Sequence, residues 1–257
     1  MKFGICLNAE RAMNDAPASA DYIELSASEI YAMDEERFEA LCDAVANKKF
    51  KTYSANNLIC PDIRLTGPDV SFDVLSSYCD KTFARLSKLG ITILVFGSGK
   101  SRNVPDGFSH DEAWEQLVRV GQLLAQKAEA YGQAVVIEPL AYNKVNIIHT
   151  FADGVRYASD VDRQNFKTLV DFYHFESNGE PYSSLGEGRT WLAHTHFATA
   201  KSRTMPNSDA DWQFFKENLY QLKAIGYDGS MSFEGGIFPT DEFDAMIAKM
   251  KEIEQTI

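Results

Sequence analysis

The sequence lacks the features that mark several common classes of protein. No apolar run approaches the roughly 18 residues that a membrane helix needs, so we expect no membrane span. The first seven residues read as a strand and have no signal-peptide architecture. The four cysteines lie far apart without a CxxC pair, which argues against a zinc knuckle and against a disulfide framework. We therefore expect a cytoplasmic protein with free thiols.

Basic residues are also fewer than acidic residues. The chain has 25 Lys and Arg against 37 Asp and Glu, which gives a formal net charge of −12. A surface of this sign repels a phosphate backbone at long range. We therefore expect no nucleic-acid partner.

What the sequence does contain is a regular alternation of short β-rich apolar runs with longer helical patterns, which is typical of βα units and a parallel sheet. Eight strands are predicted, at 3–7, 22–26, 51–57, 91–97, 134–140, 167–173, 192–197 and 229–234. These units fill all 257 residues, and no Gly-x-Gly-x-x-Gly follows any strand, which disfavours an open doubly wound sheet. The prediction is an α/β protein with a single (β/α)8 TIM barrel domain over residues 1–257.

The helical patterns separate the strands. They cover 34–47, 70–89, 111–131, 151–159, 209–225 and 241–255, with shorter helices expected within 10–19 and 177–189. Two of them end at Gly90 and Gly132, a residue type that often stops a helix.

Residues able to bind a metal end the last four strands. Three apolar runs lead into Glu138, Asp171 and Glu234, and a fourth leads into His194-Thr195-His196. The carboxyl ends of barrel strands meet on one face, which is where barrel enzymes have their active sites. Three carboxylates crowded at one point require a cation between them, and a divalent ion accepts such an oxygen-rich set with one imidazole.

The pattern alone leaves two choices open. His194 and His196 point to the same side of a strand because side chains alternate with a period of two, so either can be the ligand while the other lies one layer deeper. His174, three residues after Asp171, is a candidate to contact substrate or a second metal.

Several segments along the whole chain carry a family resemblance. They are residues 21–25 (DYIEL), 65–70 (LTGPDV), 96–99 (FGSG) with Arg102, Val104 and Pro105, 137–140 (IEPL), 171–174 (DFYH) and the final Phe233-Glu234. In their order and spacing they resemble the xylose isomerase-like TIM barrels, a group of sugar and sugar-phosphate isomerases and epimerases that includes the D-tagatose 3-epimerases, inosose dehydratases and endonuclease IV.

The resemblance implies a ligand set and a substrate-binding set. In the ketose 3-epimerases two glutamates, an aspartate and a histidine hold one divalent ion, usually manganese, and the matching residues are Glu138, Asp171, His196 and Glu234. The chemistry of these ligands also admits Zn²⁺, Co²⁺, Mg²⁺ or Fe²⁺. The two glutamates double as catalytic acid and base. His174 and Arg203 match residues that contact substrate.

One position departs from that pattern. Six residues after the first metal glutamate the epimerases carry another glutamate, where this chain has Lys144. Lys144 is therefore a candidate substrate-binding residue for a phosphorylated or carboxylated substrate. Lys100, Arg102, Lys201 and Arg203 also fall in loops expected on the active-site face.

The predicted function is a metal-dependent isomerase or epimerase that converts a small sugar or sugar phosphate through a cis-enediolate held by the ion. An inosose-type dehydratase on the same site, or a sugar-binding barrel without catalysis, are the alternatives. Endonuclease-like cleavage of DNA is disfavoured, because strands three and four end without the extra histidines that the additional zinc ions of that enzyme require. Relatives are often dimers or tetramers, so a homo-oligomer is compatible with this reading.

Overall fold

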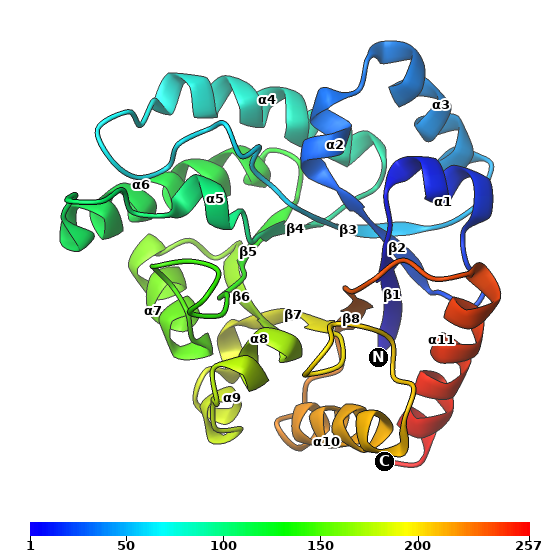
Figure 1. The fold of residues 1–257 in the computed structure, drawn as a ribbon. Coiled ribbons are helices and arrows are strands. Elements are labelled where there is room, and N and C mark those ends of the chain that lie inside the picture. Colours follow the sequence, from blue (N-terminus) through cyan, green and yellow to red (C-terminus); the bar gives the residue numbers. More distant parts are fainter.

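Eight parallel strands close into a barrel in chain order, with β1 paired to β8. A computed structural model describes all 257 residues. The strands are β1 (Lys2–Cys6), β2 (Tyr22–Ser26), β3 (Thr52–Asn56), β4 (Ile93–Phe96), β5 (Ala134–Ile137), β6 (Phe166–Asp171), β7 (Leu192–Phe197) and β8 (Ser230–Phe233). Figure 1 shows them at the centre of the molecule, with the helices in a ring around them. The predicted (β/α)8 barrel is confirmed.

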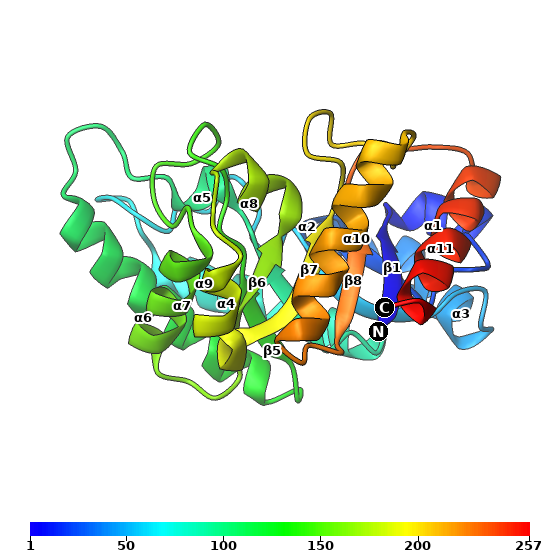
Figure 2. The ribbon, with the colours of Figure 1, turned by 90° about the horizontal axis from the view of Figure 1, so that it is seen from below.

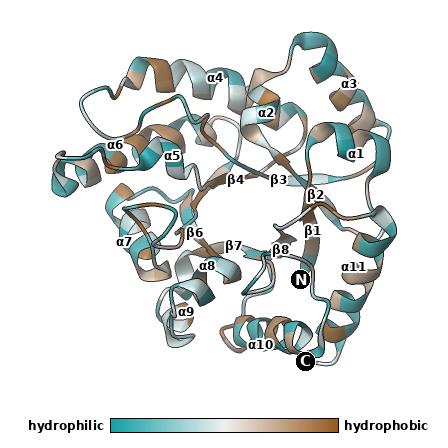
Figure 3. Cartoon of the chain, in the orientation of Figure 1, coloured by the Kyte–Doolittle hydropathy of each residue, from teal (hydrophilic) through white to brown (hydrophobic).

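The helices cover the outside of the barrel. They are α1 (Ala9–Asp15), α2 (Ala27–Ala32), α3 (Glu35–Ala46), α4 (Phe72–Lys88), α5 (Gly99–Arg102), α6 (His110–Glu129), α7 (Phe151–Val161), α8 (Phe172–Ser177), α9 (Ser183–Glu187), α10 (Asp209–Ala224) and α11 (Thr240–Gln255), with a 3-10 turn at Arg189–Trp191. Figure 3 shows apolar colour along several strands, such as β4 and β6, and both colours on the helices, as expected for helices that bury one face against a sheet. No helix combines the length and the apolar character needed to cross a bilayer.

Local sequence signals explain where the helices begin and end. Thr150 and Asp153 form a reciprocal capping box at the start of α7, which satisfies backbone N–H groups that have no partner within the helix. Ser208 and Asp211 do the same for α10. Gly90 and Gly132 follow α4 and α6 with φ of 74° and 64°, a conformation that glycine adopts without strain, so both predicted helix stops are confirmed.

The predicted strands were too long at several ends. The sixth was expected to run to residue 173, but it ends at Asp171, whose carboxylate accepts a hydrogen bond from the Tyr173 N–H and caps α8. Helix formation directly after the strand explains the difference. The short helices α2, α5 and α8 were not anticipated, because four to six residues carry little periodicity.

Two kinds of core hold the barrel. The larger lies between strands and helices, and it contains phenylalanines such as Phe83, Phe166 and Phe215. The smaller lies inside the barrel and consists of Ile93, Val95, Val136 and Leu169. The inside of the barrel therefore has a small apolar floor, and polar side chains fill the layers above it. Figure 2 shows the loops that follow the strands rising at the end opposite the N-terminus.

Candidate metal centre

Strand periodicity decides which side chains enter the barrel. Val136 and Leu169 belong to the apolar floor, so the residues two positions later, Glu138 and Asp171, point to the same interior. Asp171 pairs with His196 in the ladder, and His196 pairs with Ser232, which places Glu234 one layer higher, directly after β8. The four predicted ligands thus reach one point from four neighbouring strands.

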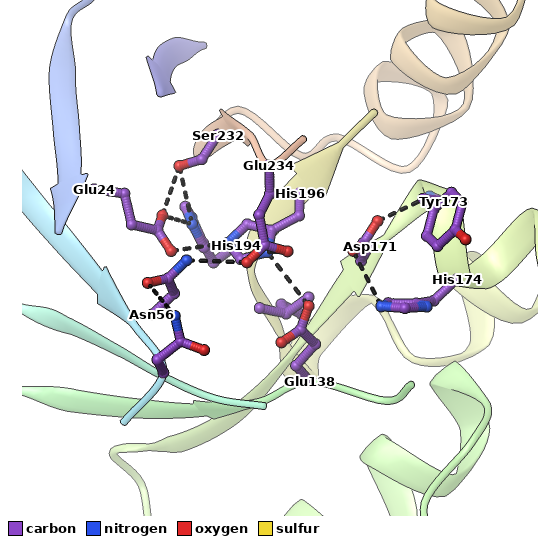
Figure 4. Close-up of polar contacts among 12 residues, drawn as sticks. Glu24, Asn56, Glu138, Asp171, Tyr173, His174, His194, His196, Ser232 and Glu234 are labelled. Carbon is purple, nitrogen blue, oxygen red and sulfur yellow. Dashed lines mark hydrogen bonds and ion pairs between the residues drawn. The ribbon is translucent and has the colours of Figure 1, made fainter. Parts of the chain in front are cut away.

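The ligand atoms of Glu138, Asp171, His196 and Glu234 all lie within 4.8 Å of one another. His196 Nδ1 is 3.4 Å from Glu138 Oε1 and 3.3 Å from Glu234 Oε2. Figure 4 shows the three carboxylates gathered around this imidazole.

Three buried atoms of this cluster have no hydrogen-bond partner: Glu138 Oε1, Asp171 Oδ2 and His196 Nδ1. Leaving a buried polar atom unpaired costs on the order of 1–3 kcal/mol, so three of them facing one point need an explanation. Their chemistry, with the carboxylate of Glu234, is that of a divalent-ion ligand set. The residues present therefore fit the ion that the fold family implies.

Glu24, which sequence reasoning left without a role, lies directly beneath this cluster. Its buried carboxylate accepts hydrogen bonds from His194 Nε2 and His196 Nε2, each at 2.9 Å. The hydroxyls of Ser54 and Ser232 each donate to Oε2 at 2.6 Å. Burial alone would raise the pKa of Glu24, but the two imidazoles hold the pKa well below its usual range.

These contacts fix the two imidazoles. A carboxylate can only accept, so His196 donates through Nε2 and presents Nδ1 to the ligand cluster. Burial opposes a charge on this ring, but the carboxylates of Glu24 and Glu234 raise the pKa of His196 well above its usual value, so a bound ion would replace the proton on Nδ1. His194 likewise donates through Nε2, while its Nδ1 lies 2.7 Å from the Ser230 hydroxyl. Both nitrogens of His194 are therefore engaged one layer deeper, which leaves His196 as the histidine of the cluster.

A second set of candidate ligands, Cys6 with Glu24 and His196, also lies within 4.8 Å. Glu24 already accepts four hydrogen bonds, and one of them comes from the His196 nitrogen on that side. Burial also raises the pKa of the Cys6 thiol well above its usual value, which disfavours the thiolate that binds metals. The cluster of Glu138, Asp171, His196 and Glu234 is therefore the better candidate for a metal site.

The two glutamates of the cluster have different electrostatic surroundings. Burial, followed by repulsion from Glu234, raises the pKa of Glu138. Burial opposes ionisation of Glu234 as well, but His196 and Arg203 outweigh it and bring the pKa of Glu234 to about 2.

The other predicted site residues surround the cluster. Arg203 Nη2 forms an ion pair with Glu234 and lies 3.6 Å from Asp171 Oδ2. His174 Nδ1 accepts from the Ala141 N–H, so its proton is on Nε2, which is 3.6 Å from Asp171 Oδ2. Asn56, also not anticipated, donates to Glu234 Oε1 at 2.9 Å.

A pocket of about 440 Å³ opens above the cluster. Glu138 and Glu234 lie at its base, and His174, Arg203 and Lys144 contribute to its wall. Lys201 and the fully buried Arg102 do not line it. Arg102 instead donates to the carbonyl oxygen of Glu138 at 2.8 Å and so supports the chain behind that ligand.

Residues 16–253 match the sequence profile of the xylose isomerase-like TIM barrel. The chain belongs to this family. The match covers most of the barrel, including all four residues of the cluster, so the resemblance noted from the sequence is confirmed.

Two curated family relatives are sugar epimerases. The chain is 32% identical over 125 residues to the 3-dehydro-D-guloside 4-epimerase of Escherichia coli, which covers 48% of this chain and 47% of the relative. It is 29% identical over 185 residues to the D-psicose 3-epimerase of Ruminiclostridium cellulolyticum, which covers 69% of this chain and 59% of the relative. The aligned parts thus span about half to three-fifths of these relatives.

Two solved structures show the same fold along the whole chain. A D-psicose 3-epimerase from Clostridium cellulolyticum H10, solved with D-tagatose, superposes with a TM-score of 0.80 at 19% identity and covers 100% of this chain and 99% of that one. The IolI protein, solved with a zinc atom, superposes with a TM-score of 0.69 at 17% identity and covers 100% of this chain and 99% of that one.

Proposed function

We propose that this protein is a divalent-metal-dependent sugar epimerase or isomerase. One observation carries the proposal. Three buried, unpaired ligand atoms and the carboxylate of Glu234 face one point at the base of a polar pocket, and Glu24 holds Nε2 of the imidazole among them so that Nδ1 faces that point. The epimerase activity of the curated relatives supports the same reading.

Glu138, Asp171, His196 Nδ1 and Glu234 would hold the ion. Three oxygen ligands and one nitrogen ligand suit Mn²⁺ and also admit Zn²⁺, Co²⁺, Mg²⁺ or Fe²⁺. When bound, the ion would supply Lewis-acid polarisation of a substrate carbonyl and so acidify the neighbouring C–H.

The protein's own residues would then move the proton. Glu138 and Glu234 come from β5 and β8, which enter the site from different sides of the barrel, and both line the pocket. One glutamate takes the proton from carbon, which leaves a planar enediolate, and the other returns a proton to the opposite face. Return to the neighbouring carbon gives isomerisation instead, whereas return to the same face of the same carbon regenerates the substrate.

His174 and Arg203 would orient the substrate. His174 presents an N–H on Nε2, because the Ala141 N–H occupies its Nδ1. Arg203 lines the pocket with its guanidinium between two carboxylates of the cluster. Both groups donate hydrogen bonds, which suits the hydroxyl and carbonyl oxygens of a sugar.

The direct test is solvent proton exchange. With Mn²⁺ present, the wild-type protein should incorporate deuterium from D2O into a ketose such as D-psicose or D-tagatose, or into a 3-keto-glucoside. Glu138→Gln and Glu234→Gln should lower the exchange rate by at least about 10³-fold, because each removes a proton-transfer group and a ligand. The matched control Glu129→Gln, an exposed residue at the end of α6, should exchange like the wild type. Wild-type exchange in Glu138→Gln would refute the assignment.

Dehydration is the second candidate, because the chain is also 26% identical over 175 residues to a 3-dehydroshikimate dehydratase from Bacillus anthracis. Loss of a β-hydroxyl from the same enolate would give an enone that absorbs in the ultraviolet. Absorbance that grows in step with exchange would favour the dehydratase, and exchange without it would favour the epimerase or isomerase.

A further inference from the structure

The pocket above the cluster is polar almost throughout. Of the 15 residues that line it, 2 are hydrophobic, and the wall includes Ser28, Asn57, Ser98 and Ser101. Such a lining cannot gain much from an apolar ligand, so it indicates a ligand that is polar along its whole length.

The charged residues of this lining are unevenly distributed. The acidic ones are Glu138 and Glu234, both of which belong to the proposed ion site at the base. Apart from Arg203, which is paired with Glu234, the cations are Lys100 and Lys144. Once the base has taken its ion, the remaining wall is positive, on a protein whose net charge is −12.

Neither Lys100 nor Lys144 has a partner in the protein. Neither ammonium takes part in a salt bridge, although acidic residues outnumber basic ones in the chain. Both side chains are exposed, whereas Glu138 is 5% exposed, so the lysines lie at the rim and the carboxylates at the base.

The backbone segments that carry these two lysines pack against each other. Lys100 belongs to α5 and Lys144 to the loop between β5 and α7, and the two segments are in contact at Gly99. A Cβ on Gly99 would lie 2.7 Å from Val145 Cγ1 and 4.0 Å from the Lys144 carbonyl oxygen. The absence of a side chain at Gly99 therefore lets the segments that carry both lysines pack closely.

We propose that the substrate carries an anionic group at the end remote from the reacting carbons, and that Lys100 and Lys144 receive it. The inference rests on the proposed function, because it takes the base of the pocket to be the reacting end. The shared chemistry is that of a carboxylate or a phosphate ester, either of which accepts charge-assisted hydrogen bonds from ammonium groups.

The test compares ligands matched in their ketose end. Calorimetric titration of the Mn²⁺-loaded protein uses D-fructose as the neutral probe, 5-keto-D-gluconate as the carboxylate and D-fructose 6-phosphate as the phosphate ester. We expect at least one anion to bind about tenfold or more tightly than D-fructose. Whichever anion does so shows whether the site prefers a carboxylate or a phosphate ester. That advantage should shrink as salt is added, because the lysines are exposed.

Substitutions test whether the two lysines cause the tighter binding of the anion. Lys100→Met and Lys144→Met should each weaken the preferred anion by about fivefold, the effect expected of a partly exposed ion pair, and leave D-fructose unchanged. Lys144→Glu should weaken it further. Lys201→Met makes the same charge change in a loop on the same face but outside the pocket, and should alter no ligand by more than about twofold.

Two outcomes would overturn the inference. One is that neither anion binds more tightly than D-fructose. The other is that the anion advantage survives in the double variant Lys100→Met/Lys144→Met. Exchange in D2O, measured on the same samples, separates this result from the proposed function. Exchange of a neutral ketose without an anion advantage would refute only the anion site, and an anion advantage without any exchange would refute only the epimerase.

Discussion

Glu24 and Glu138 are both buried glutamates inside the same barrel, yet their surroundings are opposite. Glu24 accepts four hydrogen bonds, from two imidazoles and two hydroxyls. Glu138 has one carboxylate oxygen, Oε1, without any partner, and burial raises its pKa. A buried carboxylate that is fully hydrogen-bonded is a structural anchor, whereas one that is left unpaired beside other unpaired ligand atoms requires a cation.

The same difference between hydrogen-bonded and unpaired polar side chains separates strands β2 and β3 from strands β5, β6 and β7. β2 and β3 supply Glu24, Ser54 and Asn56, all of which are engaged with other protein groups. β5, β6 and β7 supply or lead into Glu138, Asp171 and His196, each of which has an unpaired atom. In the proposed ion site, β5, β6 and β7 therefore provide ligands, and Glu24 on β2 orients one of them.

The largest predicted effect comes from crowding Glu138. A Cβ at Gly97 would lie 2.2 Å from Glu138 Oε2, so Gly97→Ala must displace that carboxylate. Because a misplacement of about 1 Å can cost about 100-fold, kcat/KM for the proposed epimerisation should fall by about that factor. Steady-state kinetics at saturating Mn²⁺ measures it.

Gly186→Ala is the matched control for this substitution. Its new methyl group would have Ile225 Cγ2 as its nearest neighbour, at 3.9 Å, so the variant should behave like the wild type. If Gly97→Ala kept full activity, the carboxylate position would not matter to the reaction and the comparison with Glu24 would fail.

Substitution of Glu24 should have the next largest effect. Gln in place of Glu24 presents an NH2 group to one of the two imidazole N–H donors, so the pair of contacts that orients the His194 and His196 rings is broken. Mn²⁺ affinity of the folded variant should fall by about 10- to 100-fold, as for other groups that support metal ligands. Calorimetric titration measures the affinity, and circular dichroism verifies folding.

Ser54→Ala sharpens this prediction, because it removes one of the four donors to Glu24 and leaves both imidazole contacts in place. Its Mn²⁺ affinity should change by no more than a few-fold. A folded Glu24→Gln protein that bound Mn²⁺ as tightly as the wild type would show that Glu24 does not orient the ligand.

The smallest predicted effect is on stability, and it concerns Glu180, which belongs neither to the ligand cluster nor to the hydrogen-bond network of Glu24. Burial raises the pKa of Glu180 to about 7, although the Phe151 N–H donates to it at 2.7 Å. Between about pH 4.5 and pH 7 the folded state therefore binds more proton than the unfolded state, and stability falls as pH rises. Discounted for partial exposure, the loss across this range should be about 1 kcal/mol.

Glu180→Gln should remove that part of the pH dependence, and urea unfolding at pH 5 and pH 7.5 measures it. The exposed Glu187→Gln should leave it unchanged. A wild-type protein that gained stability over the same range relative to Glu180→Gln would contradict the assignment.

The sequence predicted the barrel and the four clustered residues because both depend on short-range patterns. A period of two along each strand places Glu138 and Asp171 on the inner face, and the carboxyl ends of parallel strands meet at one end of the barrel. The role of Glu24 could not be predicted in this way, because its partners His194 and His196 lie 170 and 172 positions away in the chain. The signal that could have found it is a carboxylate in the middle of an apolar strand, between Ile23 and Leu25.

The remaining errors lie where one element passes directly into the next. Asp171 ends a strand and caps a helix at once, so apolar runs on both sides of it read as one continuous strand. The shared pocket wall of Lys100 and Lys144 likewise could not be predicted from the sequence, because it depends on the packing of Gly99 against a loop 45 residues later. Patterns along the chain do not contain such contacts.

Anomalous diffraction from crystals grown with Mn²⁺ tests the central claim most directly. We expect one strong peak within coordinating distance of Glu138, Asp171, Glu234 and the Nδ1 atom of His196. The Nε2 atom of His196 should still donate its hydrogen bond to Glu24. A peak elsewhere, no peak at saturating Mn²⁺, or coordination through Nε2 would contradict the account.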